Sequence, residues 1–108
     1  MDAPSHHRHT PAKTLVETKL NDLLTAREPP KTFCPSEVAR GLSRQQLLAL
    51  GYETWRDAMP AVRELAWEKR YSGELEILQR GEIVDDSVKS LDDIRGPIRL
   101  RRKMIGVV

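Results

Sequence analysis

The chain has 108 residues, enough for one small domain, and its single cysteine excludes an internal disulfide and with it the class of disulfide-stabilised secreted scaffolds. Apolar residues make up 39% of the sequence and form no run close to the roughly 18 residues of a membrane span, so we expect an intracellular protein, cytoplasmic or nuclear, without a membrane partner. The net charge of +2 hides an asymmetry: residues 74–94 carry two basic and seven acidic residues (−5), and residues 95–108 carry five basic and no acidic residues (+5).

The N-terminal part of the chain predicts a tail and one helix. Residues 1–11 are polar and rich in His, and we expect them to be disordered. Residues 12–27 predict a helix, because four apolar residues fall at helical spacing and the Pro-Pro pair at 29–30 stops the pattern. The helix begins either at Pro11, a favoured first position, or at a capping pattern that starts with Thr14.

The stretch TFCPSEVARGL predicts a second, short helix over residues 35–42. Cys34 falls at the N-cap position, proline follows it at the first helical position, and Glu37 falls where a capping box places its acidic residue. Phe33 and Val38 have the spacing of a hydrophobic staple. We therefore interpret Cys34 as a helix cap that stands where Ser or Thr is usual.

Two further helices follow. Ser43 begins a capping-box pattern for a short helix over 44–50, and a longer helix is predicted over 55–72. Pro60 lies inside the longer helix and should bend or divide it near residues 56–60. The stem of Lys69 falls on the buried face of this helix.

After Gly73 the apolar period changes from helical to alternating. GELEILQ, a Gly-containing turn and EIVD predict a β-hairpin, and the polar, acidic residues 85–96 predict a loop. GPIRLRRK predicts a third strand, with Ile98 and Leu100 on one face and the arginines on the other. The bland interpretation of those arginines is an edge strand that resists edge-to-edge pairing.

Helices followed by a small antiparallel sheet predict the α+β class and, within it, a winged helix over residues 12–103, with a short C-terminal tail at 104–108. The segments KTFCPSEVARGL, WRDAMPAVREL, GELEILQRGEIVD and RGPIRLR also resemble the family catalogued as domain of unknown function 3253, over about residues 15–103. The resemblance implies a small winged-helix-like fold and no established activity. The stretches between Leu42 and Trp55 and over 85–94 are longer than the family pattern.

The first functional hypothesis is binding of nucleic acid, with duplex DNA as the expected ligand. In a helix-turn-helix the second helix of the pair lies in the major groove, and basic side chains neutralise phosphates. The predicted contacts are Arg56, Arg63 and Arg70 on the helix over 55–72, and Arg99, Arg101, Arg102 and Lys103 on the last strand. The alternative is a solvated face, because an acidic stripe of Asp57, Glu64 and Glu68 shares that helix and residues 74–94 carry −5.

The second hypothesis is a protein-interaction adaptor. Trp67 is the predicted anchor residue, free to stack on Arg63, a base or a partner, and the acidic loop and basic strand would each meet an opposite charge. The alternative is that the C-terminal MIGVV segment covers Trp67.

An enzyme is the third possibility, and we expect it to be wrong. Cys34 is the single candidate nucleophile, and all three histidines fall in the predicted tail, at positions 6, 7 and 9. No Gly-rich phosphate loop or metal-ligand spacing is present in the sequence. We therefore predict no catalytic residue, no metal site and no small-molecule cofactor.

Overall fold

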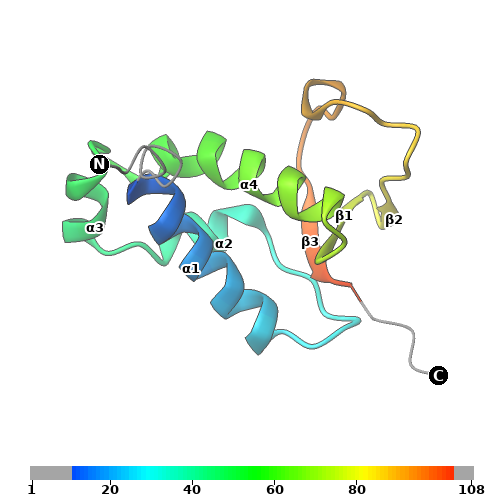
Figure 1. Cartoon of the computed structure of the whole chain (residues 1–108), viewed down its shortest axis with the longest axis horizontal. Helices are drawn as coiled ribbons and strands as arrows, with labels where there is room; N and C mark the ends of the chain where they lie inside the picture. The colour runs from blue at the N-terminus through cyan, green and yellow to red at the C-terminus, as the bar shows by residue number, and fades with distance from the viewer. Residues whose placement is uncertain (1–10, 104–108) are drawn as a thin grey trace, which may run out of the picture.

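The computed structural model describes residues 11–103 (Figure 1). The helices are α1 (Pro11–Ala26), α2 (Pro35–Arg40), α3 (Arg44–Ala49) and α4 (Met59–Tyr71), with two short 3-10 helices, η2 (Trp55–Ala58) and η3 (Leu91–Asp93). The strands are β1 (Leu75–Gln79), β2 (Glu82–Ile83) and β3 (Arg99–Arg102). The α+β class predicted from the sequence is confirmed, with four α-helices and one small sheet in this part of the chain. The expected tails lie outside the described residues, except that Pro11 begins α1.

The sheet is antiparallel with strand order β2-β1-β3. A two-residue turn joins β1 to β2, and Arg80 and Gly81 both have positive φ there, as the tight hairpin turn that matches strand twist requires. Ile77 of β1 pairs with Leu100 of β3, and both side chains are buried. The predicted alternation is confirmed around Leu100 in β3, whereas in β1 Leu78 is buried in addition to the predicted Leu75 and Ile77.

A short extended segment between α1 and α2 pairs with the other edge of β3. The backbone N–H of Phe33 donates to the carbonyl of Leu100 at 2.9 Å, and the N–H of Leu100 donates back at 2.7 Å. The Phe33 ring is fully buried. This contact ties the start of the helical part to the last strand of the sheet.

The helices pack around one core. Helix α4 contacts α1, α2 and β1, and it runs from the α3 side of the molecule to the sheet (Figure 1). The largest fully buried side chains are Phe33, Leu20, Leu75, Ile77, Ile98 and Leu100. Among the described residues, no helix is both long and apolar enough to cross a membrane.

The expected division of the long helix is confirmed. The segment 55–58 is a 3-10 helix, and the α-helix begins only at Met59, with Pro60 in its first turn. Proline has no N–H to donate to the preceding turn, so an α-helix tolerates it best at its start. The segment 85–96 was predicted to be a loop throughout. In the structure it contains the single turn of η3, which Ser90 caps.

Cys34 is the N-cap of α2, as predicted. Its backbone N–H donates to Glu37 Oε2 at 3.0 Å, and Glu37 also accepts from the Arg27 guanidinium at 2.8 Å. Burial raises the pKa of Glu37, but these two hydrogen bonds, together with the positive charges of Arg27 and Arg99, outweigh burial and hold that pKa below its ordinary value. The hydroxyl of Ser36 donates to Cys34 Sγ at 3.1 Å. Cys34 thus starts a helix.

Candidate functional site

Helix α4 separates its residues between a buried inner face and an outer face. Val62, Leu65, Ala66 and Lys69 are buried against the rest of the fold. The outer face carries Arg63 and Trp67, which are half-buried, and Arg70, whose side chain is largely covered, among exposed carboxylates and Tyr71. This outer face is where the sequence predicted ligand contacts.

The loop between β2 and β3 lies against the C-terminal half of that outer face. The Arg70 guanidinium donates to the carbonyl of Asp85 at 2.5 Å and more weakly to that of Val84 at 3.5 Å, and it lies 3.9 Å from the Asp86 carboxylate. Only 9% of the Arg70 side chain is exposed. Arg70 is therefore engaged in holding the loop, and a ligand on this face would have to compete with those carbonyls.

Trp67 stacks on Arg70. The guanidinium carbon lies 4.4 Å from the indole centroid, a cation–π distance. Arg63, the partner considered from the sequence, does not make this contact. One edge of Trp67 still lines a shallow depression with Leu91 and Lys89 of the loop. The MIGVV segment, considered as a cover for Trp67, lies outside the described residues.

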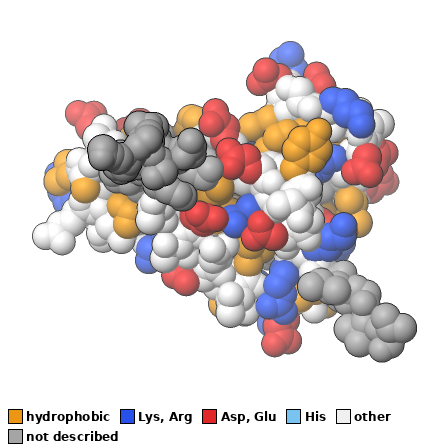
Figure 2. Space-filling model, in the orientation of Figure 1, with side chains coloured by type: hydrophobic (Ala, Val, Ile, Leu, Met, Phe, Trp, Pro, Cys, Tyr) orange, Lys and Arg blue, Asp and Glu red, His pale blue; other side chains and the backbone are white. Residues whose placement is uncertain are grey.

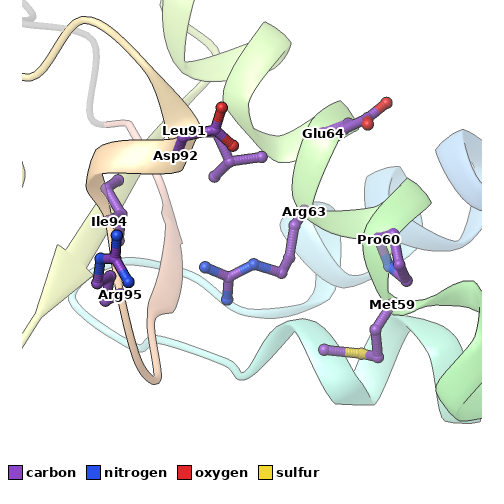
Figure 3. A pocket seen from close by; sticks show the side chains of 8 residues that line it. All are labelled: Met59, Pro60, Arg63, Glu64, Leu91, Asp92, Ile94 and Arg95. Carbon is purple, nitrogen blue, oxygen red and sulfur yellow. The ribbon is translucent and has the colours of Figure 1, made fainter.

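A groove of about 610 Å³ separates the first turns of α4 from the 91–95 segment (Figure 3). Met59 and Pro60 of α4 and Leu91 and Ile94 of the loop form its apolar surface. Its charged lining residues are Arg63, Glu64, Asp92 and Arg95.

The two guanidinium groups of this groove lie on opposite walls. The Arg63 side chain reaches from α4 across the gap toward the segment that carries Arg95, whereas Glu64 points away from the gap (Figure 3). Neither guanidinium has a hydrogen-bond or ion-pair partner among residues 11–103. The groove therefore has two guanidinium groups without a direct partner in this part of the chain, beside an apolar surface and with Glu64 and Asp92 also in its lining.

A second pair of arginines flanks Trp55 at the start of the same helical segment. The guanidinium carbons of Arg40 and Arg56 lie 4.5 and 4.6 Å from its ring centroid. Both arginines are exposed, and Trp55 is half-buried. Arg56 and Arg63 are seven residues apart and thus about two turns apart on the same side. Arg70, the next arginine at this spacing, is not free, because it donates to the carbonyl of Asp85.

The predicted contacts on the last strand also divide. Arg99 donates to the hydroxyl and carbonyl oxygens of Thr32 at 3.0 and 3.2 Å, and Arg101 forms a 2.7 Å ion pair with Glu76 on β1. Arg102 is half-buried and Lys103 is exposed. Two of the four basic side chains are thus engaged within the fold.

The acidic loop presents Asp85, Asp86, Asp92 and Asp93 to solvent. The Asp85 carboxylate accepts from the hydroxyl and then from the backbone N–H of Ser87, and these hydrogen bonds lower its pKa. Acidic and basic side chains lie side by side over the face seen in Figure 2. The structure thus has no broad single-sign surface on this face.

The described part of the chain offers little to catalysis or metal binding. It contains no His, since His6, His7 and His9 lie outside it, so Cys34 has no imidazole beside it there. Residues 11–103 also contain no group of three or more His, Cys, Asp or Glu side chains placed to hold a metal ion.

The family model described as a protein of unknown function, DUF3253, matches residues 13–103. The chain belongs to this family. The match spans the helices and the whole sheet, so the groove and the loop over α4 both lie within the DUF3253 domain. No curated protein matches the chain.

Sequence reasoning missed two residues of this DUF3253 surface, Arg40 and Arg95. Arg95 falls in a polar loop without periodicity, so no pattern could place it opposite Arg63. Arg40 lies in the last turn of α2, and its stacking on Trp55 depends on how α2 packs against η2. The one sequence feature that points to this region is Trp55, one of two tryptophans in the chain, because its ring can stack on nearby arginines.

Proposed function

We propose that the DUF3253 domain of this chain is a winged helix. The order of α1, α2, α4 and then a hairpin with a returning strand supports this fold, with α2 and α4 as the helix-turn-helix pair and α3 as an insertion between them. The Phe33–Leu100 pairing supports it further, because a winged helix commonly has a short strand after its first helix that joins the edge of the sheet.

Within that fold, we propose that the domain is a protein-interaction module. The observation that carries this proposal is the position of the acidic loop against the outer face of α4, held by Arg70. A helix that reads DNA must present a bare outer face to the major groove. Here the C-terminal half of that face is covered by a loop that carries four exposed aspartates, which repel phosphates. The opening that remains combines an apolar surface with charged side chains, as peptide-binding grooves do.

Duplex nucleic acid is the second candidate, and one specific observation favours it. The guanidinium groups of Arg40, Arg56 and Arg63 lie toward the N-terminal end of α4, and recognition helices contact bases mainly through their N-terminal residues. Arg102 and Lys103 are further candidates for phosphate contacts.

A paired binding experiment distinguishes the two functions. The full chain is immobilised and used to select from a display library of random ten-residue peptides, and its affinity for a random 20-base-pair duplex is measured in parallel between 50 and 200 mM salt. We expect enriched peptides with dissociation constants of roughly 1–100 μM and duplex binding no tighter than the roughly 10⁻⁴ M of weak non-specific complexes. Failure to enrich any peptide would overturn the adaptor proposal. Duplex binding that tightens steeply as salt falls would instead support the second candidate.

A further inference from the structure

The strongest unexplained feature of the molecule is the facing pair of guanidinium groups in the groove between α4 and the 91–95 segment. Arg63 is half-buried, and neither it nor Arg95 has a side-chain partner within residues 11–103. Arg95 is exposed, so the cost of an uncompensated buried charge applies to Arg63. The two guanidinium groups lie on opposite walls of one groove and favour an anion between them, because each repels the other and both attract it.

The surface beside this pair of guanidinium groups favours a ligand that has apolar groups as well as an anionic group. Met59, Pro60, Leu91 and Ile94 present apolar side chains to the same groove. Its volume of about 610 Å³ lies within the range of roughly 300–1,000 Å³ typical of binding pockets. A ligand that satisfies both parts has an anionic group next to apolar groups. A sugar–phosphate backbone offers no apolar group of this kind, and a peptide with an acidic and an aliphatic side chain does.

The acidic side chains near the groove restrict where the anion can lie. Glu64 points away from the gap, and Asp92 lies beside Leu91 (Figure 3). The site with the lowest cost for a negative charge is therefore the space between Arg63 and Arg95, farther from Asp92 than the Leu91 end of the groove.

We propose that this groove binds an extended segment of a partner protein that carries a carboxylate next to aliphatic side chains. The Asp or Glu carboxylate is held between Arg63 and Arg95, whose planar guanidinium groups suit two-pronged hydrogen bonding to a carboxylate. The aliphatic neighbours cover Met59, Pro60, Leu91 and Ile94 and exclude water from the ion pairs. This inference rests on the proposed interaction function and names the chemistry of its partner.

The test uses a fluorescein-labelled peptide with a central Leu-Asp-Leu triplet flanked by Gly and Ser, and its counterpart with Asn in place of Asp. Anisotropy titrations measure both peptides against the full-length chain and against Arg63→Gln, Arg95→Gln and the matched control Arg44→Gln. Arg44 is exposed on α3 and does not line the groove. We expect each groove variant, and the Asn peptide, to bind about tenfold more weakly, and Arg44→Gln to bind like the unaltered chain.

Circular dichroism and thermal melts establish that each variant is folded, which we expect because neither groove arginine has a partner among residues 11–103. A single-stranded dT10 oligonucleotide is the second probe, and binding that depends on Arg63 and Arg95 but favours dT10 over the peptide would overturn the inference. Equal affinity of the groove variants and the unaltered chain for the Leu-Asp-Leu peptide would also overturn it. If display-selected peptides bind the chain while ignoring both groove substitutions, the interaction function stands and the groove assignment fails. If no selected peptide binds at all, the interaction function itself fails.

Discussion

Lys69 allows a prediction that reverses the usual intuition about salt bridges. Its side chain is 7% exposed, and its ammonium group donates to Glu17 on α1 at 3.0 Å and to Glu74, just before β1, at 3.1 Å. Burial, the largest effect, lowers the Lys69 pKa, but its hydrogen bonds to both carboxylates, together with their negative charges, outweigh burial and raise the pKa above its ordinary value. The two carboxylates mainly compensate a charge that the fold has buried.

Two variants test whether the carboxylates only compensate the buried Lys69 charge or whether the ion pairs add net stability to the fold. In Glu17→Gln/Glu74→Gln the ammonium stays buried without a counter-charge, and we expect a loss of about 2 kcal/mol in the free energy of unfolding. That value is below the usual ~3–5 kcal/mol for a broken buried pair, because both carboxylates are partly exposed and Gln still accepts a hydrogen bond. Lys69→Met keeps the packed stem and leaves Glu17 and Glu74 hydrated, so we expect a cost of at most about 1 kcal/mol.

Urea denaturation at pH 7 measures both variants. A Lys69→Met variant less stable than the double Gln variant would refute the reasoning, because the ion pairs would then contribute net stability. The pH dependence gives a second check. The Ser72 hydroxyl and then Lys69 lower the Glu74 pKa, so the stabilisation is present above about pH 4 and is lost as the pH falls through the folded-state pKa. The difference between the unaltered chain and the double variant should therefore shrink toward pH 3.

Four further substitutions test the fold and the loop. Cys34→Ser should fold normally, keep any binding activity, and change the free energy of unfolding by between zero and about +1 kcal/mol, because Ser is a preferred N-cap; a folded variant that lost binding would return attention to the thiol. Phe33→Ala should cost about 3–5 kcal/mol in a urea titration, since the ring is fully buried, and a loss below about 1 kcal/mol would contradict its place in the core. Arg70→Gln should speed amide hydrogen exchange in residues 84–95 more than Arg56→Gln does, because Arg56 donates no hydrogen bond to that loop; equal exchange in the two would show that Arg70 does not hold it. Glu37→Gln should lower the melting temperature at pH 7 but not at pH 3, since the stabilisation from a carboxyl of lowered pKa is lost as the pH falls, and a loss that stayed constant with pH would exclude an ionic role.

Local signals explain why most elements were predictable. The start of α2 was determined by the cap, proline, acidic residue and staple between Phe33 and Val38, and all of these act within one helical turn. The break before Met59 followed in the same way from the missing N–H of Pro60. The strands followed from alternation, which sheet geometry imposes wherever one face is buried.

The candidate site was harder to predict because its geometry depends on contacts between distant segments. Heptad spacing placed Arg56, Arg63 and Arg70 on one side of a helix, and spacing alone treats the three as equivalent. The structure makes them different: Arg56 stacks on Trp55, Arg63 faces a groove, and Arg70 donates to the carbonyls of the loop. No local pattern indicates that a polar, acidic loop will return to cover the helix, because the apolar residues that seat it, Leu91 and Ile94, are isolated in the sequence.

The structure explains part of the abrupt change from acidic to basic sequence near residue 95. Some of these charges are neutralised inside the fold, since Glu76 pairs with Arg101 across the sheet and Glu74 pairs with Lys69. The aspartates of the loop are exposed, and the Arg95 guanidinium has no partner among residues 11–103 although it lies only two residues after Asp93. A loop that neutralised its own arginine would leave the groove with no preference for an anion. With Arg95 unpaired opposite Arg63, and Asp92 at the Leu91 end of the groove, the space between the two guanidinium groups is the place that favours a carboxylate.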